Sequence, residues 1–194
     1  TLAEIIYRPF WNVPTSILGE EILPRLAIDP GYLQREQMEL VAGQGDQSPV
    51  VAPTPENLAR LRTGSVRLRQ RPGPANSLGL IKFSFPNEND VYMHGTPAQA
   101  LFALSRRDFS HGCVRVEDPI GLAEWVLREQ SGWDRERIAS AMQADVSSRV
   151  AIRVPVRVML LYSTAAVLLD SGDVAFADDI YGHDGRLDQA LRGR

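Results

Sequence analysis

Short strand-like segments on both sides of Cys113, the only cysteine in the chain, constrain the fold more than any other feature of the sequence. Residues 80–85 and 91–94 are mostly apolar and are separated by the turn-forming residues 86–89, and further segments of this kind follow in the last third of the chain. Residues 135–143, by contrast, place their apolar side chains at helical spacing. The sequence therefore predicts an α+β fold with short helices, in which a mixed β-sheet or sandwich can hold the cysteine loop in place.

The composition is that of an ordinary globular chain. Its 194 residues are enough to bury a sizeable core, and we expect one domain spanning residues 1–194. The formal net charge of −3 gives no reason to expect a nucleic acid partner. No apolar run approaches the roughly 18 residues of a transmembrane helix. No basic leader with an apolar segment opens the sequence, so we expect any export signal to lie outside it.

Cys113 has histidine and glycine residues near it in the sequence, and this combination suits covalent acyl transfer. The thiolate is the nucleophile, so a base must take the thiol proton, and His94 at the end of a predicted strand can serve. The second ring nitrogen of His94 needs an acceptor, for which a backbone carbonyl near Gly95 is expected. The backbone N–H groups of Gly112 and Cys113 could form an oxyanion hole, because glycine allows a close approach.

Two other interpretations of these residues remain open at this point. A lone cysteine is most often a small buried hydrophobe without reactivity. Alternatively, His94, His111, Cys113 and His183 could together bind zinc, although they lack the paired spacing of structural zinc sites. In an extended segment, His111 and Cys113 would lie on the same face. His111 could then be a second proton handler, a substrate contact or a hydrogen-bonded spacer.

Several segments resemble one family of known enzymes. His94-Gly95-Thr96 followed by Ser110-His111-Gly112-Cys113-Val114-Arg115 is similar to the signature of the L,D-transpeptidases, bacterial cysteine enzymes that cross-link peptidoglycan. Other segments resemble a large-type subgroup that carries an inserted lid over its active site; these are residues 11–14, 29–33, 72–79, 82–87 and 179–182. The resemblance therefore extends over nearly the whole chain.

The resemblance implies a nucleophile, a base and an orienting carbonyl, which would be Cys113, His94 and Gly95. Cys113 would attack the carbonyl between the L-centre of meso-diaminopimelate and the terminal D-alanine of a stem tetrapeptide. The acyl group would then pass to a diaminopimelate side-chain amine, giving a 3→3 cross-link. Carbapenem-type β-lactams would acylate the same cysteine. A periplasmic or cell-envelope location is expected, and no metal or organic cofactor. The residues expected to bind substrate are Tyr92, Arg115, His111, Ser110 and Asn76.

Simpler explanations compete for three of these residues. Arg115 could pair with Glu117 on the surface. Tyr92 could be a wall residue rather than a specific ligand contact. Asn76 lies in a loop rich in proline and glycine, where asparagine commonly bonds its own backbone.

The resemblance also leaves the domain organisation and the exact reaction open. Residues 17–69 match the position of the helical lid, and the alternative is an ordinary surface excursion. Domains of this family usually begin with further strands upstream of residues 11–14, so we expect either that those strands are missing from this sequence or that the sheet is smaller. The same site could act as an L,D-carboxypeptidase or exchange free D-amino acids. With an inert thiol, the chain would be a non-enzymatic cell-wall-binding module. None of these alternatives inserts the chain into a membrane.

Overall fold

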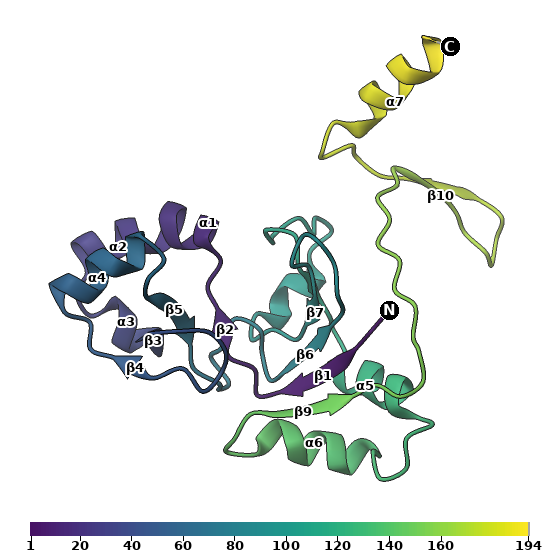
Figure 1. Cartoon of the computed structure of the whole chain (residues 1–194). Helices are drawn as coiled ribbons and strands as arrows, with labels where there is room; N and C mark the ends of the chain where they lie inside the picture. The colour runs from purple at the N-terminus through teal and green to yellow at the C-terminus, as the bar shows by residue number, and fades with distance from the viewer. Residues whose placement is uncertain (194) are drawn as a thin grey trace. The chain divides into compact units, whose positions relative to one another are not determined.

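The computed structural model describes residues 1–193, which fall into two compact units (Figure 1). The first unit is Thr1–Arg157, and the second begins at Val158. The predicted α+β class is confirmed, because short helices accompany three separate β-sheets. In the part of the chain that the structure describes, no helix has the length and apolar character needed to cross a bilayer.

A five-stranded sheet with the order β8-β7-β6-β1-β9 forms the centre of the first unit. Its neighbouring strands are antiparallel, except for β7 and β8, which run parallel. The strands are β1 (Glu4–Tyr7), β6 (Ile81–Ser84), β7 (Met93–His94), β8 (Val114–Arg115) and β9 (Ser148–Ala151). The two segments predicted as strands before Cys113, residues 80–85 and 91–94, therefore do meet in one sheet as β6 and β7, although β7 and β8 are only two residues long.

Buried side chains from the central strands and from two helices make up the core of this unit. Ile5 on β1 and Phe83 on β6 are completely buried. Leu127 and Ile138 are also completely buried, and they come from the helices α5 (Pro119–Leu127) and α6 (Arg135–Gln143). The α6 boundaries agree with the sequence prediction, because both apolar spacing and an Asp134 N-cap specify this helix locally.

Residues 11–70, which we call the insertion, form a small subdomain with a core of its own. Its antiparallel sheet has the order β2-β5-β3-β4 and consists of β2 (Trp11–Asn12), β5 (Arg67–Gln70), β3 (Met38–Val41) and β4 (Val50–Val51). Its helices are α1 (Thr15–Ile17), the π-helix η1 (Leu18–Ile22), α2 (Leu23–Ile28), α3 (Tyr32–Arg35) and α4 (Pro55–Arg62). Residues 17–69, where a helical lid is expected, therefore contain strands as well as helices, and the lid role stays a prediction.

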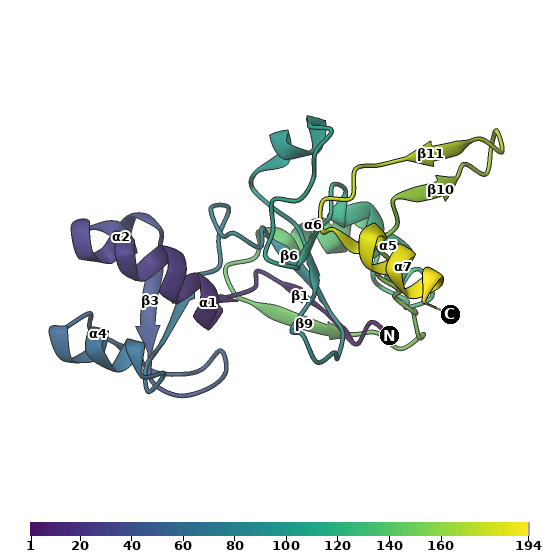
Figure 2. The same ribbon diagram turned by 90° about the horizontal axis from the view of Figure 1, so that it is seen from above.

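The insertion lies to one side of the five-stranded sheet in both views (Figures 1 and 2). Its core packs Leu18 and Ile22 of η1 with Leu40 of β3 and Leu68 of β5. Asp46, in the loop after β3, forms a 2.6 Å ion pair with Arg149 of β9. The insertion is thus a folded body that is tied to the edge of the central sheet.

The second unit consists of a hairpin and a terminal helix. The hairpin strands are β10 (Ala165–Val167) and β11 (Val174–Phe176), and the helix is α7 (His183–Arg192). Residues 156–162 are one of the strand-like segments that the sequence predicts in the last third of the chain, but they form no strand. Helix α7 was not predicted; its start is fixed by the Asp179 carboxylate, which accepts hydrogen bonds from the backbone N–H groups of His183 and Asp184.

The remaining short element is the 3₁₀-helix η2 (Gln99–Ala103). It lies between β7 and the cysteine loop in the chain. The connection from β7 to β8 therefore carries the cysteine back to the same sheet edge as His94.

Candidate active site

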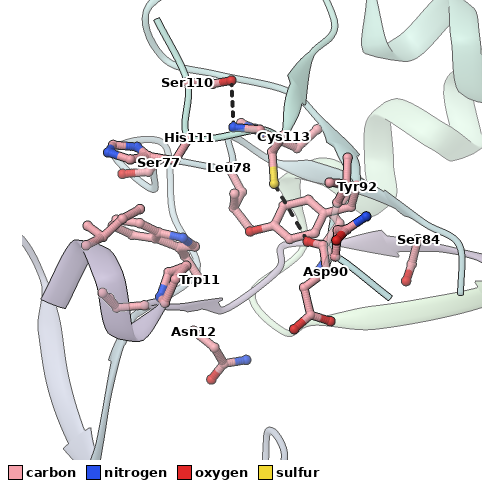
Figure 3. A pocket seen from close by; sticks show the side chains of 18 of the residues that line it. Trp11, Asn12, Ser77, Leu78, Ser84, Asp90, Tyr92, Ser110, His111 and Cys113 are labelled. Carbon is pink, nitrogen blue, oxygen red and sulfur yellow. Dashed lines mark hydrogen bonds between the residues drawn. The ribbon is translucent and has the colours of Figure 1, made fainter. Parts of the chain in front are cut away.

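Cys113 and His94 line the same cleft, which has a volume of about 1130 Å³. One wall comes from the sheet edge and the cysteine loop, and the other comes from the first residues of the insertion, including Trp11 and Glu21. The close view shows the Cys113 sulfur near Tyr92 and Asp90, with Trp11 and Asn12 on the insertion side (Figure 3). The insertion therefore contributes to the cleft.

The parallel pairing of β7 with β8 brings the cysteine loop to the histidine. The N–H of Val114 donates to the Tyr92 carbonyl at 3.0 Å, and the N–H of Val116 donates to the His94 carbonyl at 2.8 Å. Cys113 immediately precedes β8, so it lies beside Tyr92 on the neighbouring strand. Cys113 and His94 are therefore supported by two neighbouring strands and not by one shared helix.

A row of cationic side chains crosses the sheet at the level of His94. The strand register pairs Lys82 of β6 with His94 of β7, and His94 with Arg115 of β8. Because paired residues in a sheet point to the same face, Lys82 and Arg115 flank the imidazole. All three residues line the cleft.

His94 is held as a neutral imidazole. It is only 5% exposed, and its Nδ1 lies 2.5 Å from the Gly95 carbonyl oxygen. A carbonyl can only accept, so Nδ1 carries the proton and Nε2 keeps its lone pair. Burial lowers the pKa of His94 to about 4, aided by the charges of Arg115 and Lys82 and opposed by the backbone carbonyls of Gly95 and Leu78. At neutral pH the ring can therefore accept a proton.

The backbone behind His94 is packed too tightly for a side chain. Gly79 has a positive φ of 64°, and a Cβ atom there would lie 2.7 Å from the Thr96 nitrogen and 2.8 Å from the Gly95 carbonyl carbon. Both the conformation and the close approach require glycine. The loop at residues 72–79 thus supports the segment that orients the histidine.

Cys113 is partly exposed and forms no disulfide. Its thiol donates a weak hydrogen bond to the Asp90 carbonyl, with the sulfur 3.9 Å from the oxygen. Asp90 itself has a φ of 51°, an unusual conformation for a residue with a side chain. Burial, followed by the charge of Cys113, raises the pKa of the neighbouring Tyr92 phenol. The structure thus places Cys113 at an open cleft rather than in a sealed apolar interior.

The two backbone groups expected to form the oxyanion hole differ in their partners. Gly112 has a φ of 123°, and its N–H donates to the Ser110 hydroxyl at 3.3 Å. Among residues 1–193 we find no acceptor for the Cys113 N–H. The Cys113 amide is therefore the more available donor, and the oxyanion assignment stays a prediction.

Four of the five residues expected to bind substrate line the cleft, namely Tyr92, Ser110, His111 and Arg115. Arg115 donates to the Phe109 carbonyl at 3.0 Å rather than pairing with Glu117. The Nε2 atom of His111 lies 3.0 Å from the Glu21 carboxylate of the insertion. His111 therefore joins the cysteine loop to the opposite wall, while its role toward substrate stays a prediction.

Asn76, the fifth residue, was wrongly predicted to contact substrate. Its side chain is completely buried and does not line the cleft. The side-chain amide donates to the carbonyls of Pro9, Gln70 and Arg71, and its oxygen accepts from the Leu78 N–H at 2.8 Å. The amide is fully occupied by the backbone, so Asn76 fixes its own loop, as asparagine commonly does in turns.

Sequence reasoning missed Lys82, Asp90 and Glu21, all of which line the cleft. Lys82 carried a usable signal, because it is the only lysine in a chain with 20 arginines and it interrupts an apolar strand. Asp90 and Glu21 gave no such signal in the sequence. The position of Asp90 depends on a strained turn, and that of Glu21 depends on the placement of the insertion. No group of three or more possible metal ligands comes together within residues 1–193, so these residues do not support the zinc interpretation.

The fold and the site define a class of protein: an α+β chain with a solvent-accessible cysteine and a neutral histidine on adjoining segments of one sheet edge. The chain belongs to the YkuD family of L,D-transpeptidase catalytic domains, whose family model matches residues 1–156. This result confirms the family resemblance seen in the sequence. L,D-transpeptidases are cysteine enzymes that act on peptidoglycan peptides.

The chain is also similar to a Haemophilus influenzae protein that is provisionally named an L,D-transpeptidase. The two are 32% identical over 190 residues, which cover 97% of this chain. The chain spans 37% of the length of that relative.

Proposed function

We propose that this chain is a peptidoglycan L,D-transpeptidase of the periplasm or cell envelope, with Cys113 as nucleophile and His94 as general base. The observation that carries the proposal is that a partly exposed thiol and a buried, neutral imidazole line the same cleft in a member of this family. A neutral histidine can take the thiol proton, whereas a histidine already protonated could not.

In the first half-reaction, the Cys113 thiol transfers its proton to Nε2 of His94. The sulfur attacks the carbonyl carbon between diaminopimelate and the terminal D-alanine, forming a carbon–sulfur bond and a tetrahedral oxyanion. The N–H of Cys113, together with Gly112 if its contact with Ser110 opens, would stabilise that oxygen. His94 then gives the proton to the departing amine, so D-alanine leaves and a thioester remains.

In the second half-reaction, the diaminopimelate side-chain amine of another stem attacks the thioester. His94 takes a proton from the amine and returns it to the sulfur as the new amide forms, which gives a 3→3 cross-link. Tyr92, His111 and Arg115 line the cleft at positions where they would contact the donor stem. Water as acceptor would make the chain a carboxypeptidase, and a free D-amino acid would make it an exchange enzyme.

Intact-mass measurement of the acyl-enzyme tests the nucleophile directly. Cys113 is the only cysteine, so modification of a thiol is unambiguous. Incubation with a carbapenem should add the mass of one ring-opened drug molecule, and Cys113→Ala should add none. His94→Asn should slow acylation by about 10²-fold or more, the range typical of losing a general base. His183→Asn is the matched control, because His183 does not line the cleft.

Product analysis with a tetrapeptide donor distinguishes the possible acceptors. Release of D-alanine together with a cross-linked dimer supports transpeptidation, whereas a tripeptide product alone supports the carboxypeptidase. Incorporation of an added D-amino acid supports exchange. Absence of both the carbapenem adduct and D-alanine release would overturn the enzymatic proposal and favour a wall-binding module.

A further inference from the structure

Lys82 is the one lysine of this chain, and its ammonium lies inside the cleft rather than on the outer surface. It stands on β6 in register with His94, and its Nζ lies 3.6 Å from the centre of the Tyr92 ring. Tyr92 in turn lies beside Cys113 through the pairing of β7 with β8. The ammonium is thus fixed by a cation–π contact next to the nucleophile and the base.

The surroundings of Lys82 leave its charge without a dedicated counter-ion. Among residues 1–193, no carboxylate forms an ion pair with Lys82 and no acceptor forms a hydrogen bond with it. Glu4 of β1 is already paired with Arg149 of β9 at 2.8 Å. The titratable and charged groups that face Lys82 are Cys113, Arg149, Glu4, Asp90, Tyr92, His94 and Arg115.

We propose that Lys82 is a positioning residue for the reaction, because its ammonium stabilises the Cys113 thiolate and opposes protonation of His94. This role rests on the proposed function in taking Cys113 as the nucleophile. Lys82 transfers no proton: the thiol proton passes to Nε2 of His94, and Lys82 stabilises the negative charge left on sulfur. A lysine suits this task because it is a compact point charge, whereas a guanidinium is larger and planar.

The local electrostatics agree with this assignment. Burial lowers the pKa of Lys82, and the largest opposing influence is the negative charge of Cys113. The charge of Lys82 contributes to the lowered pKa of His94. An ammonium that interacts with both groups therefore has a favourable effect at sulfur and an unfavourable one at the imidazole.

The test compares Lys82→Met with the parent chain in two measurements. The rate of Cys113 alkylation by iodoacetamide at neutral pH reports the reactivity of the thiol, and the histidine ring signals in proton NMR report the pKa of His94. Removing the ammonium should slow alkylation by about tenfold and raise the pKa of His94 by about one unit, which is the low end of the effect of a neighbouring charge. A substitution that merely loosened the cleft would expose His94 without slowing alkylation.

Two variants serve as controls. Lys82→Arg keeps the positive charge and should restore most of the alkylation rate and of the low His94 pKa. Arg62→Met removes one positive charge from an exposed position on α4, outside the cleft, and should leave both measurements unchanged.

A reciprocal measurement needs no substitution at Lys82. As the only lysine, Lys82 can be labelled by reductive ¹³C-methylation and titrated by NMR, with the α-amino group as the other signal. Its pKa should be lower in Cys113→Ala than in the parent chain, because coupling between two sites is mutual. An unchanged alkylation rate and an unchanged His94 titration in a folded Lys82→Met, or an unchanged Lys82 titration in Cys113→Ala, would overturn the proposal. Alkylation needs no peptidoglycan, so a failure of acyl transfer would leave this result intact.

Discussion

The neutral state of buried His94 predicts a specific dependence of stability on pH. The pKa of His94 is about 4 in the folded protein, against an ordinary value of 6.5 for an exposed histidine. Between these values the unfolded chain binds a proton at this position and the folded chain does not. The free energy of unfolding therefore rises as the pH increases from 4 to 6.5. Above pH 6.5 His94 causes no further change, and below pH 4 its full contribution to stability is lost.

The size of the effect follows from the same two values. A difference of one proton between the states changes the free energy of unfolding by about 1.4 kcal/mol per pH unit, so the window corresponds to roughly 3 kcal/mol. His94 is only 5% exposed, so solvent screens the ring little. Against a typical domain stability of about 5–15 kcal/mol, a loss of this size is readily measured.

The assay is urea unfolding at several pH values between 4 and 8, for the parent chain and for His94→Asn. Asparagine can still donate to the Gly95 carbonyl but cannot take up a proton. All three tryptophans lie within residues 1–157, so tryptophan fluorescence reports the unit that contains the site. The other titratable groups are present in both proteins, so their contributions cancel when the two free energies of unfolding are subtracted. A difference that stays constant within about 1 kcal/mol across the window would refute the reasoning.

Two further substitutions test contacts around the cleft by the same unfolding assay. Asn76→Ala should lower the free energy of unfolding by roughly 2–4 kcal/mol, because it leaves a buried N–H and buried carbonyls without partners; a loss below about 1 kcal/mol would contradict this. Glu21→Gln should change it by less than about 1 kcal/mol, since the Glu21 and His111 side chains are 42% and 57% exposed. A larger loss would show that this contact holds the insertion in place.

Local sequence information was sufficient for the elements whose signals are local. Helix Arg135–Gln143 has the predicted boundaries, and helix α4 begins at a local N-cap in which Thr54 accepts from the Asn57 N–H. Each of these depends on side-chain periodicity or on a bond spanning a few residues. The strand predicted at residues 156–162 failed because an apolar run becomes a strand only if another strand pairs with it, and the sequence does not show the partner.

The sequence by itself singled out the residues that we propose carry the chemistry: the single thiol of Cys113, a histidine at a strand end and the glycine that precedes the thiol. Only the tertiary structure decided what surrounds them. The row of Lys82, His94 and Arg115 exists because β6, β7 and β8 pair in one register, and a shift of one residue would turn these side chains to the other face. Register and burial arise from contacts between segments far apart in the chain, which no local pattern encodes.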